Sequence, residues 1–311
     1  MKEHKSLNEL KEISHKNDFA FQIGSLNFKT PLKDFLSIFK EKFESMIFHK
    51  NLFEQETQKE CSIILLKEKL IKSDVINNSK VIEKDKLNIL FLEIKRIMDI
   101  ELETSGNYFF VKLLYINDVS IEILGKITLK FDNYKEAQIF QYFIEKEKIN
   151  AWQQFFEKTI ITEPFIYQDH FFLKKVNSRG DEEKRVIVLS DEYILNIDYQ
   201  ILVLPKKNDF GGKEFEFKLH KPKWALSIKS FEELQLIRKK KTNDYMIKIK
   251  VNQKINKTYV NDHKLPFKNK SSTDFIFQNE KICRFFIFQI KRLYYNLDDE
   301  KRYIKVTESK G

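Results

Sequence analysis

The chain has 311 residues, of which 42% are hydrophobic, so it can bury a substantial core and wholesale disorder is excluded. Only 7 glycines and 5 prolines are present, which leaves little room for glycine-rich phosphate-binding loops. The formal net charge is +10, and the longest uncharged run, residues 19–28, is far shorter than the roughly 20 residues needed to cross a bilayer.

The first residues predict helices and no signal peptide, because no apolar run follows the charged start. Ser-Leu-Asn-Glu at positions 6–9 fits a capping box and predicts a short helix. We assign residues 1–30 to an N-terminal extension that contains it. Thr30 and Pro31 fit the start of a second helix. Its apolar face is Leu32, Phe35, Leu36, Phe39 and Phe43.

Residues 46–131 change to the short apolar runs of strands. A helix is predicted to begin at Asn133 and to continue through Trp152 and Phe156 toward the second half. We group residues 31–158 into a first domain. Its predicted strands are 46–53, 62–66, 69–75, 88–94, 97–102, 108–115 and 120–131.

The second half, residues 159–311, repeats this order of strands followed by a helix, which begins near Asn279. Residues 165–199 are predicted to form a meander of three strands, with one face of the third strand buried. Gly180 stands in the first turn, where a tight hairpin needs a residue that tolerates positive φ. Further strands are predicted at 200–204, 215–219, 224–228, 234–238, 245–251 and 275–277.

The repeat can be followed residue by residue. Leu-x-Ile-Lys-x-Ile at 92–97 matches Leu-x-Ile-Lys-x-Phe at 226–231, and Phe-x-Asn at 131–133 matches Phe-x-Asn at 277–279. The spacing between matched positions grows along the chain, so the second unit needs an insertion. The polar, lysine-rich residues 252–272 are the place where we expect it.

The meander also carries a family resemblance. FFLKKVNSRGDEEKRVIVLSDEYILNIDY, residues 171–199, resembles the opening strands of pleckstrin-homology domains, and most closely the tail homology domain of class I myosins. Together with the sequence repeat, the resemblance implies an α+β, mainly β fold of two tandem pleckstrin-homology-like, partly open barrels, each closed by a C-terminal helix. It also implies a binding module for acidic phospholipids or proteins, with no catalytic role and no cofactor.

No motif indicates an enzyme. The six histidines are scattered without metal-ligand spacing, and GxSxG, GxxxxGK[ST] and GxGxxG are all absent. Cys61 and Cys283 stand far apart, as expected of ordinary buried thiols in a reducing compartment. We therefore expect a cytoplasmic protein that is not an enzyme.

The resemblance implies a lipid site beside the first turn of the meander, where basic side chains would converge on phosphate oxygens. Its residues would be Lys174, Lys175, Arg179, Lys184 and Arg185. Asp181, Glu182 and Glu183 put negative charge in the same loop and weaken this interpretation. Lys184 and Arg185 are also neighbours on a strand and must point to opposite faces.

The net positive charge comes entirely from residues 161–311, because residues 1–160 hold 25 basic and 25 acidic residues. A basic face would suit an acidic partner, but lysine-rich coding bias explains the excess equally well. The face would contain Arg238, Lys239, Lys240, Lys241, Lys248 and Lys250. Nucleic acid is disfavoured because no aromatic platform is interleaved with these residues.

From these observations we expect a non-catalytic scaffold that joins protein surfaces in a cytoskeletal assembly, with the ciliary axoneme and microtubules as examples. Its partners would be acidic protein surfaces such as tubulin. The alternative is a peripheral membrane protein that binds acidic phospholipids or phosphoinositides through the second unit.

Overall fold

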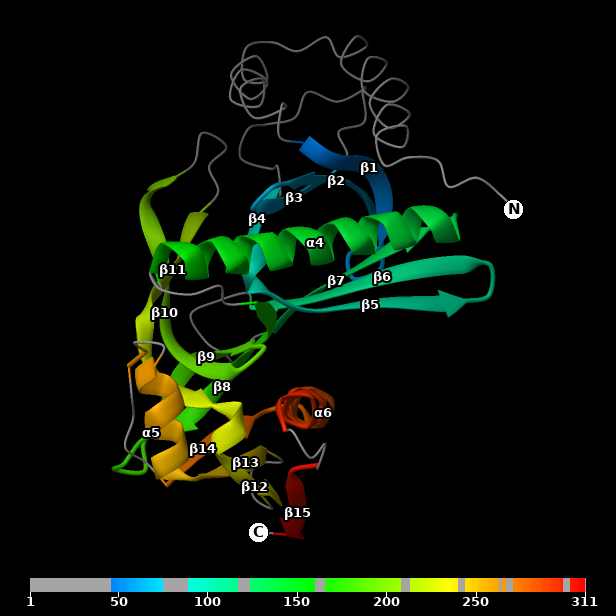
Figure 1. Cartoon of the computed structure of the whole chain (residues 1–311). Coiled ribbons are helices and arrows are strands. Elements are labelled where there is room, and N and C mark those ends of the chain that lie inside the picture. Colours follow the sequence, from blue (N-terminus) through cyan, green and yellow to red (C-terminus); the bar gives the residue numbers. More distant parts are fainter. Residues whose placement is uncertain are drawn as a thin grey trace, which may run out of the picture.

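The computed structural model describes residues 46–74, 89–116, 124–159, 166–207, 213–239, 244–262, 265–266, 271–298 and 303–310. Within these residues the chain is mainly β, with two sheets and three α-helices (Figure 1). The helices expected within residues 1–45 lie outside the described residues.

Sheet one has seven strands, all antiparallel to their neighbours, in the order β4-β3-β2-β1-β7-β6-β5. The strands match the predicted segments closely. They are β1 (Met46–Glu54), β2 (Lys59–Leu66), β3 (Lys69–Asp74), β4 (Ile89–Glu93), β5 (Ile97–Ser105), β6 (Tyr108–Ile116) and β7 (Leu124–Phe131).

Sheet two has eight strands in the order β11-β10-β9-β8-β14-β13-β12-β15. Its first seven strands therefore repeat the order of sheet one, and β15 is added at the edge, parallel to β12. The strands are β8 (Tyr167–Val176), β9 (Glu182–Ser190), β10 (Tyr193–Lys207), β11 (Lys213–Ser227), β12 (Phe231–Arg238), β13 (Tyr245–Val251), β14 (Ser272–Phe277) and β15 (Lys305–Lys310).

The sequence repeat marks equivalent places in the two sheets. Its first pair of segments forms the same 3₁₀ turn between the fourth and fifth strands, η3 (Ile94–Arg96) and η4 (Ile228–Ser230). Its second pair precedes the helix that follows each seventh strand. There the side chains of Asn133 and Asn279 accept hydrogen bonds from the amides of Lys135 and Lys281, each at 2.8 Å. Both asparagines thus satisfy amides that the first helical turn leaves unpaired.

In each unit the helix that follows the seventh strand packs into the core of its sheet. α4 (Tyr134–Thr159) contributes Ala137, Phe140 and Ile144 to the core of sheet one. α6 (Glu280–Leu297) contributes Cys283, Phe286, Ile290 and Leu293 to the core of sheet two. Both cysteines are buried and neither forms a disulfide, as expected, and burial raises the pKa of Cys283 to about 12.

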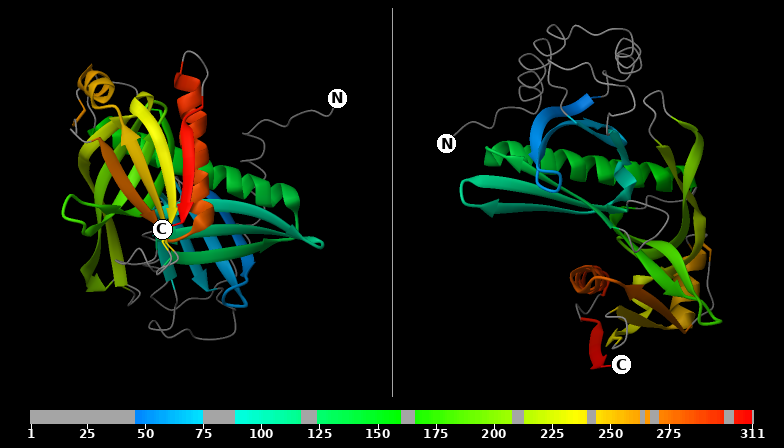
Figure 2. Two further views of the ribbon diagram at one scale, coloured as in Figure 1. Left: turned by 90° about the horizontal axis from the view of Figure 1, so that it is seen from below. Right: turned by 180° about the vertical axis from the view of Figure 1, so that it is seen from behind.

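The structure corrects the predicted strands in two places. The segments 200–204, 215–219 and 224–228 are parts of two long strands, β10 and β11, and their hairpin extends beside sheet one (Figure 2). β15 was not predicted at all. The expected insertion is confirmed, because α5 (Gln253–Asp262) lies between β13 and β14, where sheet one has no helix among its described residues.

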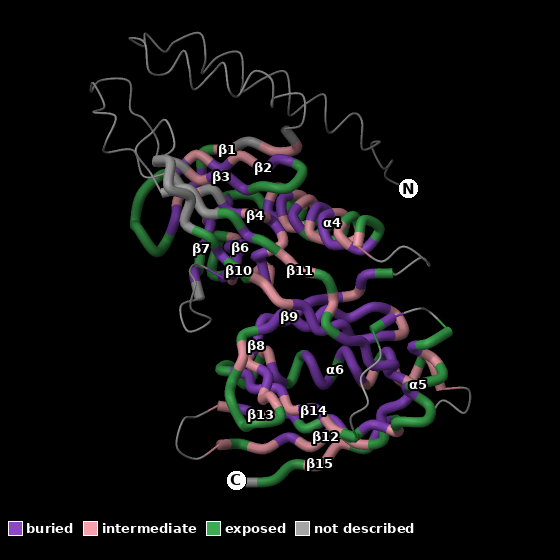
Figure 3. The backbone as a smooth tube through the Cα atoms, turned by 90° about the vertical axis from the view of Figure 1, so that its left-hand side faces the viewer, coloured by how far each residue is buried: buried purple, intermediate pink, exposed green. Residues whose placement is uncertain are grey.

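The central strands of sheet two are buried on both faces, whereas one buried face was predicted. Ile194 and Asn196 of β10 are as buried as Tyr193 and Leu195, which alternate with them. β9 is buried along most of its length for the same reason (Figure 3). One face packs on α6 and the other packs toward α4. A strand that is covered on both sides reads as a continuous apolar run, as Val186–Leu189 does.

Candidate functional site

The predicted lipid site falls on the hairpin between β8 and β9. Gly180 has a φ of +90°, as its place in the turn required. The side chain of Asn177 holds the turn, since its Oδ1 accepts from the amides of Arg179 at 2.8 Å and Asp181 at 3.0 Å. The hairpin is therefore built as the sequence predicted.

Carboxylates engage the basic side chains on the inner face of this hairpin. Lys175 is 3% exposed, and its Nζ donates to the carbonyl of Val176 at 3.1 Å and lies 4.0 Å from Glu183. Arg185 is 9% exposed and lies 2.7 Å from both Glu183 and Asp198. Partial burial opposes ionisation of Glu183, but its hydrogen bond from Asn177 and the charges of Arg185 and Lys175 lower its pKa.

The five predicted lipid-binding residues do not converge on one point. Lys175 and Arg185 share the inner face, while Lys174 and Lys184 lie opposite each other on the outer face. Lys174 lies 3.3 Å from Glu182, and Arg179 stands exposed at the turn. The hairpin carries mixed charge on both faces.

The basic face lies at one end of sheet two. Lys248 and Lys250 of β13 are exposed on the same side of the sheet, and Lys250 lies 3.3 Å from Glu232. Arg238 ends β12 and covers the ring of Tyr245 at 5.9 Å, and Lys239 lies 3.4 Å from Glu182. Lys240 and Lys241 lie outside the described residues.

A site that was not predicted lies between the two sheets. We call it the seam, and define its core by Trp152 and Phe156 of α4 packed against Tyr167, Phe172 and Val188 of sheet two. Trp152 is fully buried, with its ring centroid 4.6 Å from that of His170. The 26-residue helix α4 therefore packs in both halves. Its first part lies in the core of sheet one and its last part lies in the seam.

Polar groups of the seam are buried with the apolar ones. His170 is 1% exposed, and its Nδ1 lies 2.7 Å from the Tyr167 hydroxyl. Burial, together with the charge of Lys148, holds the pKa of His170 well below its usual value, so the ring is neutral near pH 7. Burial raises the pKa of Asp169, although Lys148 at 3.7 Å and Gln289 at 3.3 Å favour its ionised form.

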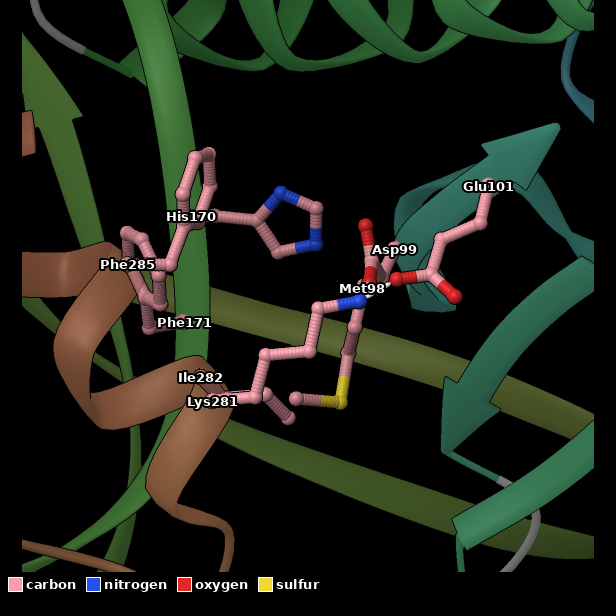
Figure 4. A pocket seen from close by; sticks show the side chains of 8 residues that line it. All are labelled: Met98, Asp99, Glu101, His170, Phe171, Lys281, Ile282 and Phe285. Atoms are coloured by element: carbon pink, nitrogen blue, oxygen red, sulfur yellow. Dashed lines mark ion pairs between the residues drawn. The ribbon is translucent and has the colours of Figure 1, made fainter. Parts of the chain in front are cut away.

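Beside His170 the seam leaves a cavity of about 250 Å³. The His170 ring and the Lys281 side chain both point toward Asp99 in this cavity (Figure 4), and Lys281 forms ion pairs with Asp99 and Glu101. The remaining lining is mostly apolar. It consists of Met98 from β5, Phe171 from β8, and Ile282 and Phe285 from α6.

The cavity lining offers few groups that could take part in catalysis. None of its eight lining residues carries a hydroxyl or thiol nucleophile, and its two carboxylates are held by Lys281. Among the lining residues, the His170 ring is the neutral base. Nucleophilic catalysis requires a base that lies beside a nucleophile, and the lining residues supply no such nucleophile. Within the described residues, no cluster of three or more histidine, cysteine, aspartate or glutamate side chains could hold a metal ion.

No protein-family model matches the chain, and no curated protein matches it. None of the described helices is both long and apolar enough to cross a membrane.

Proposed function

We propose that the chain is a non-catalytic scaffold of two tandem pleckstrin-homology-like units that joins protein surfaces in a cytoskeletal assembly. The observation that carries the proposal is the seam. Trp152 and its neighbours fix one sheet against the other through a buried core, so surfaces on the two sheets keep a constant spacing and orientation. A connector between other proteins needs that property.

The basic face supplies one docking surface. Lys248 and Lys250 are exposed on β13, and their ammonium groups would meet an acidic protein surface such as that of tubulin. The seam cavity has no catalytic set of groups, which supports a role in binding. We place the protein with the cytoskeleton, where the ciliary axoneme and microtubules offer acidic surfaces.

Microtubule co-sedimentation tests the proposal. The full chain should pellet with microtubules at low salt and less at high salt, because surface charge attraction is screened. Lys248→Glu/Lys250→Glu should abolish pelleting. The matched control is Lys135→Glu/Lys146→Glu, which reverses two exposed lysines on α4 and should pellet normally. If both variants lost pelleting equally, the net charge of the chain and not the basic face would determine binding, and the assigned face would be wrong.

Binding to acidic phospholipids is the second candidate. It is favoured by the two inner-face cations of the hairpin, Lys175 and Arg185, which occupy the position that the family resemblance assigns to headgroup contacts. Liposome co-sedimentation separates the two functions. Salt-resistant binding to phosphoinositide vesicles that is lost in Lys175→Ala/Arg185→Ala would displace the scaffold proposal.

A further inference from the structure

Both units of the chain line the seam cavity. Sheet one contributes Met98, Asp99 and Glu101 of β5, and the second unit contributes the residues from β8 and α6. An apolar cavity of about 150 Å³ holds benzene, so about 250 Å³ has room for one ring with a short side chain. The cavity is therefore the size of a small molecule, and a molecule inside it would contact both units at once.

The charged groups that line the cavity do not balance. Asp99 and Glu101 carry two negative charges, whereas Lys281, which forms ion pairs with both of them, carries one positive charge. The fourth titratable group of the lining, His170, adds no charge because its ring is neutral near pH 7. One negative charge is left over at the cavity.

The surplus charge lies at Asp99. Lys281 is closer to Glu101, and its Nζ lies 3.9 Å from Oδ2 of Asp99. The adjoining pair of Asp169 and Lys148, 3.7 Å apart, balances itself and leaves the surplus unchanged. Burial is the main cause of the raised pKa of Asp169, and the negative charge of Asp99 adds to it. The field of Asp99 therefore reaches its neighbours.

A buried polar atom faces the same space. His170 is 1% exposed, its ring points toward Asp99 in the cavity (Figure 4), and its Nε2 makes no hydrogen bond with the described residues. Burial and Lys148 hold the pKa of the ring low, whereas the carbonyls of Lys95 and Ile97 act to raise it. These carbonyls and Asp99 favour a positive charge that the neutral ring does not supply.

We propose that the seam cavity binds a small organic cation, an amine whose ammonium group lies beside Asp99 and whose apolar ring packs against Phe171 and Phe285. The ammonium group neutralises the surplus charge, and the apolar lining takes the ring out of water. Because the ligand contacts both units, it stabilises their docked arrangement and should raise the temperature of unfolding. The site is separate from the basic face, so the proposal does not depend on the microtubule result.

Fluorine NMR of the full chain tests the proposal with three probes that share one ring. At neutral pH para-fluorobenzylamine is a cation, para-fluorobenzyl alcohol is neutral and para-fluorobenzoate is an anion. The amine should bind most tightly and the benzoate most weakly, because the cavity carries a surplus negative charge. Added salt should narrow the difference between the amine and the alcohol.

Two variants of the cavity, each with a matched control, locate the binding. Asp99→Asn keeps the shape of the side chain and removes its charge, so it should weaken amine binding by roughly tenfold and leave alcohol binding unchanged. Asp132→Asn makes the same change at an exposed position and should have no effect. Phe285→Ala removes part of the lining and should weaken both probes several-fold. Phe288→Ala, on the next turn of α6 and 59% exposed, should weaken neither.

Circular dichroism should be the same in all four variants, since Asp99→Asn preserves shape and Phe285 is 44% exposed. Absence of binding by every probe, or an amine that binds no more tightly than the alcohol, would overturn the cation site. Tighter binding of the benzoate would overturn the class of ligand. An equal loss in Phe285→Ala and Phe288→Ala would place the probes on the exposed rings of α6 and overturn the cavity as the site.

Discussion

Sheet one and sheet two each contain seven strands in the same order, but they differ at the fifth strand. In sheet two β15 pairs with the fifth strand, β12, whereas in sheet one the fifth strand, β5, stands at the end of the strand order. Sheet two also carries α5 between its sixth and seventh strands. The shared part builds a core under a helix in each unit. The differences lie at the edge and in an inserted segment, where a fold can gain a binding surface without disturbing its core.

The largest effect is expected where the two units meet. Trp152→Ala should lower the free energy of unfolding by about 3–5 kcal/mol, because it removes a fully buried indole from the seam core. Urea denaturation measures the change. Tyr142→Ala removes an exposed ring from the same helix and should cost much less. Equal costs would mean that the seam does not hold the sheets together.

The next prediction concerns Ile304, the residue immediately before β15, which is the strand that distinguishes sheet two. Ile304→Ala should cost about 2–5 kcal/mol, since the side chain is buried in the core beside α6. The neighbouring Tyr303 is 68% exposed and stacks on Tyr295, so Tyr303→Ala should cost far less. Chemical denaturation compares the two. A negligible cost for Ile304→Ala would show that β15 contributes little to sheet two.

The third prediction is a pH dependence that comes from the seam. The pKa of His170 is far below its usual 6.5 in the folded chain, so below about pH 6.5 the unfolded chain binds a proton that the folded chain does not. The unfolding free energy should therefore fall by about 1.4 kcal/mol per pH unit from there down to the folded-state pKa.

Denaturation at pH values between about 5 and 6.5 tests this slope. Asp169, whose pKa is raised, contributes a slope of the opposite sign, so the comparison with a His170 variant isolates the histidine. His170→Gln should abolish the slope, and His220→Gln, which changes a partly exposed ring, should retain it. The same slope in all three proteins would place the titrating group elsewhere.

The smallest effect tests the equivalence of the two units. Asn133→Ala and Asn279→Ala each remove the side-chain cap of the helix after the seventh strand, and each should cost about 1 kcal/mol. Thermal unfolding of the two variants should give similar shifts. Clearly different costs would mean that the matching sequence positions are not energetically equivalent.

The sequence predicted most elements because their signals are local. The segments 92–97 and 226–231 match because the same 3₁₀ turn needs the same buried isoleucines, Ile94 and Ile228. β15 escaped prediction because Lys-Val-Thr-Glu-Ser-Lys is short and polar, and its strand conformation comes from pairing with β12, more than sixty positions earlier. A partner that remote leaves no periodic signal.

The candidate site was predicted only in part. The hairpin and its basic residues were placed correctly on β8 and β9, but Asp198, which pairs with Arg185, comes from β10 and had no local signal. The seam was missed because His170 acquires its surroundings from α4, β5 and α6. The one available hint was a polar Asp-His pair, Asp169 and His170, inside an otherwise apolar strand.

The placement of the two tryptophans has a practical consequence. Trp152 belongs to the seam and Trp224 to the interior of sheet two, 6.4 Å from Phe275. Because the chain has no other indole, single-tryptophan proteins would emit from one known location each. The fluorescence of Trp152 would report when the two halves dock, and that of Trp224 would report when sheet two forms. The two events can then be followed separately during refolding or during synthesis on the ribosome.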